Sequence, residues 1–179
     1  MVSLKADKTK HLLRRYGENM VDEALIKKVM WESAKEIFDT MVALPLEQAD
    51  HEQEQAEQDT SLICSITFMG PLQGCFLMQC HIPSAEKIAR AMLMMEPTDP
   101  LDETEVSDAF GEVVNMTLGG IKSRLLDTVG EIKISIPTTI KGKEIWPKPP
   151  KTAIKTEVMA KFADNRLKLI MLCNEKKGD

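Results

Sequence analysis

The sequence predicts an α+β fold in which an antiparallel sheet built from hairpins packs against long helices. Two pairs of β-like runs, at 61–82 and 153–173, each reverse direction across a short turn, as antiparallel strands do. Two longer segments, at 21–44 and 103–128, instead place apolar residues at the spacing of 3 and 4 that lines one face of a helix. The regular crossover helices that build a parallel sheet are missing from this order of elements.

The composition fits one globular domain. The 179 residues are 43% hydrophobic and 28% charged, and a chain of this length buries roughly 70% of its unfolded surface, so its core needs no disulfide or metal. No apolar run approaches the ~20 residues of a membrane-spanning helix, so we expect no membrane insertion. A net charge of −5 with 4% aromatic residues disfavours nucleic acid as a partner. Four cysteines without a CxxC pair favour a reducing compartment, and we expect a cytoplasmic protein.

The chain begins with a basic segment. Residues 1–20 are rich in lysine and arginine and poor in apolar residues, which predicts a mobile tail, with a basic docking arm as the alternative. The single domain then spans 21–179. Its first helix, at 21–44, ends at Pro45. The next segment, 47–59, holds six acidic residues, four glutamines and two alanines, and is predicted to be a mobile acidic loop.

A hairpin and a short helix follow the acidic loop. The hairpin joins 61–68 to 75–82 through a turn that contains glycine and proline. Ser84 is expected to cap the short helix, because a serine hydroxyl can accept a hydrogen bond from a free N–H of the first turn. Two prolines, at 97 and 100, then break this helix.

The longest predicted helix, 103–128, has signals at both ends. Asp102 with Glu105 three residues later resembles a capping box, and Gly130 supplies the stop at the C-terminal end. An alternating run at 132–136 predicts a strand.

The second hairpin lies near the end of the chain. It joins 153–162 to 167–173 and is expected to reverse at Asp164–Asn165, two residue types that favour turns. With the first hairpin, it supplies the strands of the predicted antiparallel sheet.

One arc of the 103–128 helix is apolar and must face the core. At about 100° per residue it collects six residues: Val106, Phe110, Val113, Val114, Thr117 and Ile121. The opposite side carries polar residues and a glycine at spacings of 4, 3 and 4: Asp108, Glu112, Asn115 and Gly119. An ordinary solvated helix face is one interpretation of this pattern. The other is an exposed ridge that presents two carboxylates and an amide to a partner.

Two consecutive glycines interrupt this helix. Glycine inside a helix costs about 1 kcal/mol relative to alanine, and the chain accepts that cost at Gly119 and again at Gly120. Either the missing side chains let a partner come close to the helix beside Asn115, or the two glycines are an accident of packing.

The sequence does not predict a metal site or a hydrolytic triad. Cys80 and His81 are adjacent on a predicted strand, so their side chains point to opposite faces, and no second pair completes four ligands. The other histidines, His11 and His51, lie in the tail and the acidic loop, where a catalytic base would not be held in place.

The ridge residues match a known signature. The pattern Asp108-x3-Glu112-x2-Asn115, followed by Pro137 after twenty-one intervening residues, resembles that of the CheC, CheX and FliY chemotaxis phosphatases. Gly111, which directly precedes Glu112, and Gly119, four residues after Asn115, also resemble the residues of this family at those positions. The likeness extends over 62–142 in residue detail, and a single copy of the motif is similar to CheX rather than to CheC, which carries two.

The resemblance implies a function. The substrate would be the aspartyl phosphate of a response regulator such as phosphorylated CheY, with Glu112 and Asn115 entering the regulator's active site. Asn115 would orient the attacking water, and Glu112 would pair with the regulator's lysine. Asp108 would add a supporting hydrogen bond, and Gly111 and Gly119 would support partner binding.

The resemblance also implies partners and cofactors. Mg²⁺ would come with the regulator, so the chain would need no cofactor or metal of its own, and CheX-type members pair as homodimers through their sheets. The alternative is a non-catalytic module that docks a response regulator or a flagellar switch component without hydrolysing the phosphate.

Overall fold

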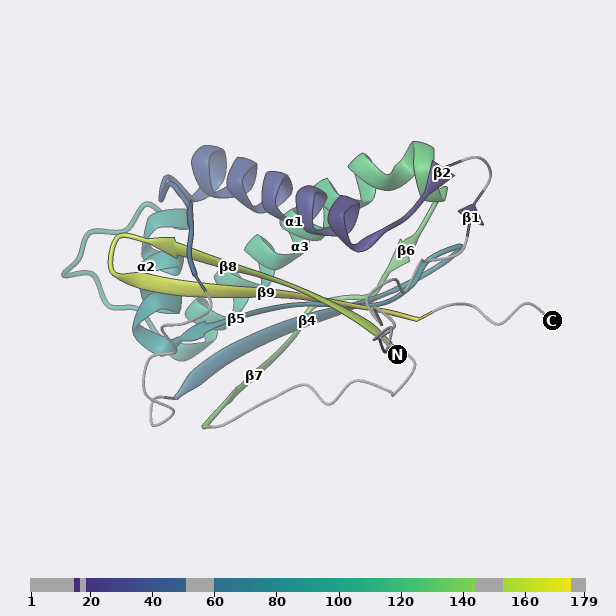
Figure 1. Cartoon of the computed structure of the whole chain (residues 1–179). Helices are drawn as coiled ribbons and strands as arrows, with labels where there is room; N and C mark the ends of the chain where they lie inside the picture. Colours follow the sequence, from purple (N-terminus) through teal and green to yellow (C-terminus); the bar gives the residue numbers. More distant parts are fainter. Residues whose placement is uncertain (1–14, 17–18, 51–59, 144–152, 175–179) are drawn as a thin grey trace, which may run out of the picture.

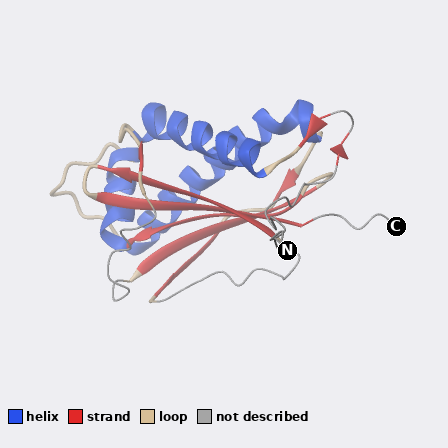
Figure 2. Cartoon of the chain, in the orientation of Figure 1, coloured by secondary structure: helices blue, strands red, loops and turns tan. Residues whose placement is uncertain are grey.

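A computed structural model describes residues 15–16, 19–50, 60–143 and 153–174 of the chain. Within these residues, helices cover one face of a seven-stranded antiparallel sheet (Figures 1 and 2). In spatial order the strands are β3 (Glu47–Gln48), β8 (Ile154–Phe162), β9 (Asn165–Asn174), β5 (Gln73–His81), β4 (Ser61–Met69) and β6 (Lys133–Ile134), and β7 (Thr138–Gly142) also pairs with β4. The predicted α+β class with an antiparallel sheet is therefore confirmed.

The helical layer contains α1 (Glu23–Ile37), a π-helical turn η1 (Phe38–Val42), α2 (Ile82–Met92) and α3 (Glu103–Val129). In Figure 1, α1 and α3 lie over the sheet, and α2 lies at the end where β5 leads into it. In this part of the chain, no helix is long and apolar enough to cross a bilayer.

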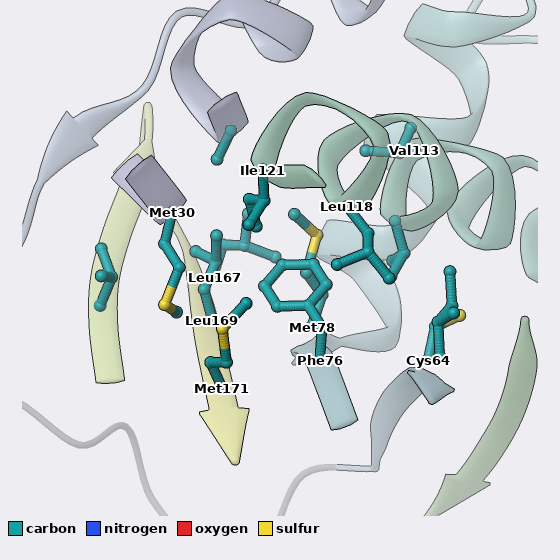
Figure 3. Packing of buried hydrophobic residues seen from close by; sticks show 14 of the residues in the cluster. Met30, Cys64, Phe76, Met78, Val113, Leu118, Ile121, Leu167, Leu169 and Met171 are labelled. Atoms are coloured by element: carbon teal, nitrogen blue, oxygen red, sulfur yellow. The ribbon is translucent and has the colours of Figure 1, made fainter. Parts of the chain in front are cut away.

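The main core lies between the helices and the inner face of the sheet (Figure 3). Strand residues alternate between the two faces, so Phe76 and Met78 of β5 point toward the helices and are fully buried. Leu118 and Ile121 of α3 are also buried in this cluster. A smaller apolar cluster occupies the opposite face of the sheet: Ile63, Leu77, Ile170 and Leu172.

The first helix ends earlier than the sequence suggests. Asp22 caps its start, with the Leu25 N–H donating to Asp22 Oδ1 at 2.7 Å. After Ile37 the chain passes into η1, and Ala43 ends the helix with φ of 57° and an N–H that donates to Phe38 O. The expected end at Pro45 is therefore wrong, because a left-handed residue has already broken the helix.

The cap predicted for the short helix is also wrong. α2 starts at Ile82, with His81 as its N-cap and Pro83 in its first turn, where a fixed φ and a missing N–H cost nothing. Ser84 lies inside the helix, buried, and its Oγ donates to Asn165 Oδ1 at 3.2 Å. The hydroxyl thus joins α2 to the β8–β9 hairpin instead of capping a helix.

Both predicted hairpins form, and the second turns one residue earlier than expected. Its turn is Ala163–Asp164, with a positive φ of 46° at Ala163, and Asn165 already pairs with Phe162 as the first residue of β9. The Asn165 side chain reaches back, with Nδ2 donating to Phe162 O at 3.3 Å.

The strand predicted at 132–136 is shorter and is followed by a strand that the sequence did not reveal. Only Lys133–Ile134 forms β6. At Ser135 one hydrogen bond to β4 is still between main-chain atoms, because Ser135 N–H donates to Thr67 O at 2.9 Å. The other is made by the side chain, since Thr67 N–H donates to Ser135 Oγ at 3.1 Å. The chain then returns to the edge of β4 as β7, just past Pro137.

Two predicted mobile segments are partly ordered. Glu47–Gln48, expected in the acidic loop, pair with Lys161 and Ala160 of β8. In the basic tail, β1 (Arg15–Tyr16) pairs with β2 (Asn19–Met20). Residues 1–14, 17–18 and 51–59 lie outside the described residues, so the mobility of the tail and of the loop stays a prediction.

Candidate functional site

The start of α3 is fixed by a reciprocal cap. Asp102 Oδ1 accepts from the N–H groups of Thr104 at 2.8 Å and Glu105 at 2.9 Å, and Glu105 Oε2 accepts from Asp102 N–H at 2.9 Å. The predicted capping box is therefore present. It sets where the helix begins, and hence which residues face the core along its 27 residues.

The predicted buried arc of α3 is confirmed. Its six residues are all buried: Val106, Phe110, Val113, Val114, Thr117 and Ile121. The one hydroxyl among them, on Thr117, donates to Val113 O at 2.8 Å, so it is satisfied inside the core. Burial of this arc turns the opposite side of the helix outward.

The outward side carries the residues of the signature. We call Asp108, Glu112, Asn115 and Gly119 the α3 ridge. Asp108 and Glu112 are exposed, while Asn115 and Gly119 are half-buried. Asn115 Nδ2 donates to Glu112 Oε2 at 3.4 Å, a long contact that holds the amide beside the carboxylate. Within the described residues, the Asn115 side chain has no other hydrogen bond, so its Oδ1 acceptor is available to a ligand.

Pro137 lies against the helix beside this ridge. A Cβ placed on Gly111 would meet Pro137 Cβ at 3.6 Å and Thr139 Oγ1 at 3.9 Å, which are ordinary contacts. On a helix surface Gly111 is the neighbour of Asp108 and Asn115, three residues before and four after it. The distant proline of the signature therefore returns to the motif and packs next to it, which the sequence interpretation did not foresee.

Gly111 itself is buried under this contact. Pro137 and Thr139 of the same chain cover Gly111, so this residue could support partner binding only indirectly. Ile136, the residue before Pro137, is 83% exposed.

The two consecutive glycines of α3 have different surroundings. A Cβ on Gly120 would meet Ser33 Cβ and Oγ at 3.2 Å, so this glycine lets α1 pack closely on α3. Arg124 stabilises the same contact between α3 and α1. Its Nη1 donates to Ser33 Oγ at 3.2 Å, and its Nη2 donates to Glu36 Oε2 at 2.6 Å. A Cβ on Gly119, by contrast, would meet nothing within 4 Å.

The cysteines and His81 do not form a second site. Burial raises the pKa of all four thiols, for Cys173 to about 12, which disfavours a nucleophilic thiolate. Cys80 is fully enclosed in the core, as expected for a packed cysteine. Within the ranges that the structure describes, no three His, Cys, Asp or Glu side chains come together in an arrangement that could hold a metal ion. His11 and His51 lie outside those ranges.

A pocket of about 220 Å³ lies beside the N-terminal half of α3, and the ridge does not line it. Its lining combines apolar residues, such as Ile82 and Val106, with polar ones, and includes the ion pair of Lys141 Nζ with Glu103 Oε1 at 2.6 Å. The signature residues therefore lie on the outward side of a helix and are not among the residues that line this pocket.

Comparisons with known proteins identify a family for this chain. The model of the family described as chemotaxis phosphatase CheX matches residues 62–159, which include α2, α3 and the whole signature. No curated protein is similar enough to count as a match.

Several solved structures share the fold. CheX from Vibrio vulnificus has a TM-score of 0.70 at 21% identity, over 86% of this chain and 99% of that one. The CheX of a CheX–CheY–BeF3–Mg²⁺ complex from Borrelia burgdorferi has a TM-score of 0.65 at 18% identity, over 83% and 97%. The FliM middle domain from H. pylori has a TM-score of 0.55 at 8% identity, over 86% and 88%. Since the family model covers more than half of the 179 residues, this chain belongs to the CheX family of chemotaxis phosphatases.

Proposed function

We propose that this protein hydrolyses the aspartyl phosphate of a CheY-type response regulator, with Asn115 positioning the attacking water and Glu112 anchoring the regulator. The observation that carries the proposal is the outward projection of both side chains from one face of α3, 3.4 Å apart. Membership of the CheX family supports the reaction class.

The shape of the ridge favours a protein substrate. A small molecule is bound by enclosing most of its surface in a concave site, whereas the ridge lies on the outward side of a helix and lines neither described pocket. A partner with a concave active site can instead receive the two side chains. The Borrelia burgdorferi relative was crystallised with CheY, BeF3 and Mg²⁺, and fluoroberyllate resembles a phosphoryl group in charge and shape. That complex supports a phosphorylated receiver domain as the partner here.

The chemistry of the two side chains fits different tasks. An amide does not titrate near neutral pH, so Asn115 cannot be a general base, but its Oδ1 can accept a hydrogen bond from water and hold the oxygen in line with phosphorus. Water oxygen then bonds to phosphorus as the bond from phosphorus to the aspartate oxygen breaks, which releases inorganic phosphate and the free carboxylate. Catalysis here is positioning rather than proton transfer.

Glu112 supplies charge one turn away. A carboxylate that is exposed before binding can form a charge-assisted hydrogen bond with a lysine of the regulator. Asp108 adds a supporting hydrogen bond, and Mg²⁺ is held by the regulator, so the chain brings no metal. We place the protein in the cytoplasm, where response regulators are phosphorylated.

We also propose a homodimer formed through the sheets. Ile140 of β7 supports it, because this residue pairs with Ile63 on the sheet face opposite the helices and is 50% exposed, whereas the apolar cluster of that face is itself buried. A monomer in sedimentation equilibrium at micromolar concentration would contradict this proposal.

The alternative is a module that docks a regulator or a flagellar switch component without hydrolysis. The likeness to the FliM middle domain favours it to the extent that one fold can host several functions. The identity of residue 115 argues for catalysis, because docking alone tolerates many side chains there.

The test is phosphate release from a phosphorylated CheY-type receiver domain with Asn115→Ala. We expect the acceleration of hydrolysis to fall by roughly 10²-fold, as for a lost positioning group, with the dissociation constant for the fluoroberyllate-loaded regulator kept within threefold. Release equal to that of the wild type would overturn the proposal. Wild-type protein that binds without accelerating release would establish the docking module instead.

A further inference from the structure

Among the residues that the structure describes, none explains why position 119 is a glycine. Glycine is usually retained in a protein for a positive φ or for crowding at its Cα. Gly119 lies within α3 and is not among the residues with positive φ, and a Cβ there would meet nothing within 4 Å. Its neighbour Gly120 meets Ser33 at 3.2 Å and so has an internal reason. A glycine inside a helix lowers the stability of that helix. Because no described contact at Gly119 compensates for this loss, the glycine points to a contact with another molecule.

The position of Gly119 places that contact on the ridge. It follows Asn115 by four residues, which is about 6 Å along the helix axis and roughly 40° around it. The neighbours three and four residues away bound it on the surface: Asn115, Met116, Lys122 and Ser123. The missing side chain therefore leaves a notch between Asn115 and the next turn.

Beyond the notch the same side of the helix continues to Leu126, which is 48% exposed. The spacing of 4, 3, 4, 3 and 4 from Asp108 to Leu126 passes through Gly119 and Lys122. A half-buried cation, Lys122, and an exposed apolar side chain, Leu126, thus follow the notch.

We propose that the notch at Gly119 receives a main-chain segment of the phosphorylated receiver domain, the segment beside its phosphoaspartate. This inference rests on the proposed function and adds a second contact to it. Asn115 can reach the phosphoryl group only if the regulator approaches the helix closely one turn further on. A Cβ at 119 would hold the partner's backbone away from α3 and lift the phosphoryl group out of reach of Asn115. A small ligand does not fit here, because a notch on the outward side of a helix has no enclosing walls.

The proposal predicts opposite effects on stability and on docking. Gly119→Ala fills open space and improves helix propensity, so it should raise the melting temperature by roughly 2–4 °C. The same change should weaken binding of the fluoroberyllate-loaded regulator. Gly119→Leu, with more bulk, should raise the dissociation constant further, by roughly five- to hundredfold. A purely structural glycine would show neither the gain in stability nor the graded loss of affinity.

Gly120→Ala is the matched control. Its Cβ would press on Ser33 at 3.2 Å, so it should not gain the stability that Gly119→Ala gains, and it should bind the regulator like the wild type. The rate of phosphate release at saturating regulator distinguishes two causes of lost activity: a regulator held away from α3 at position 119, and an Asn115 amide moved from its position. Loss of clearance at position 119 raises the dissociation constant and lowers kcat together, whereas a misplaced amide lowers kcat at an unchanged dissociation constant.

The experiment measures melting temperature, the dissociation constant for the fluoroberyllate-loaded receiver domain, and the pre-steady-state rate of phosphate release. If both Gly119 variants were more stable and bound the regulator with an unchanged dissociation constant, the proposed contact of the regulator at Gly119 would be wrong. Binding can be measured without hydrolysis, so a wild type that binds but fails to accelerate release would defeat the proposed function and leave the test of the notch intact. If Gly119→Leu fails to fold, the alanine variant still decides the question.

Discussion

The side-chain amide of Asn115 donates to the carboxylate of Glu112 across 3.4 Å, one turn apart on the exposed side of α3. The contact is long, so it restrains the amide without consuming its full hydrogen-bonding capacity. With one N–H turned to Glu112, the Oδ1 atom of Asn115 remains available for water. The pair thus couples an anchoring charge to a positioning group through adjacent turns of one rigid helix.

Charge at Glu112 should control affinity. Glu112→Gln keeps an acceptor for Asn115 but removes the charge, and we expect a roughly tenfold weaker complex from the lost charge-assisted bond. Glu112→Lys should weaken it further, because a cation would face the regulator's lysine. The Glu112 side chain is exposed, so neither substitution should change the melting temperature. Titration at two salt concentrations measures the effect, and wild-type affinity for Glu112→Lys would contradict the anchoring role.

Asp102 should matter for stability and not for docking. Its carboxylate satisfies two N–H groups of the first turn of α3, so Asp102→Ala should cost about 1 kcal/mol and lower the melting temperature by roughly 2–4 °C. Asp108→Ala removes the same charge from an exposed position of the helix without a cap, and is the control for stability. Equal melting temperatures for the two variants would show that the cap contributes nothing.

The contact of Gly111 with Pro137 should tolerate one methyl group and no more. A Cβ at 111 would lie 3.6 Å from Pro137, so Gly111→Ala should fold normally. Gly111→Leu would push Pro137 and Thr139 away from α3 and destabilise the domain by about 1–3 kcal/mol. Urea denaturation of both variants measures the difference. An unaffected leucine variant would mean that Pro137 is not held against the helix.

Local signals accounted for much of the candidate site. The Asp102–Glu105 box and the buried arc from Val106 to Ile121 depend on neighbours within one or two turns, and the structure confirms both. The outward direction of Glu112 and Asn115 follows from that arc, because the opposite side of a packed helix must face away from the core.

Contacts between distant segments could not be predicted in this way. Pro137 packs on Gly111 only because the chain leaves the sheet after β6 and returns as β7, and no local pattern encodes that return. Ser84 was a plausible cap by residue type, but Pro83 begins the helix earlier and Asn165 from the second hairpin takes the hydroxyl. In both cases a contact between segments distant in the sequence, which no local pattern reveals, decides where the residue lies.

Glu157 offers a pH test of the sheet face opposite the helices. Its Oε1 atom lies 2.6 Å from Lys155 Nζ and 3.4 Å from Lys168 Nζ. Burial by itself would raise the pKa of Glu157, but the two lysines outweigh it and lower the pKa below its ordinary value of 4.5. A folded-state pKa below the unfolded one means that ionised Glu157 stabilises the fold above about pH 4.5, and that this stabilisation is lost as pH falls through the lower, folded value.

Glu157→Gln should therefore reduce the free energy of unfolding at pH 7 and reduce it less at a pH below 4.5, because the wild-type carboxylate itself gains a proton as the pH falls through its folded pKa. Urea denaturation at the two pH values measures the difference between variant and wild type. Glu47→Gln is the matched control, because its ion pair with Lys161 at 3.1 Å is largely exposed and should contribute little at either pH. A deficit in Glu157→Gln that stays the same or grows on acidification would mean that lost packing, and not the two lysines, accounts for the effect.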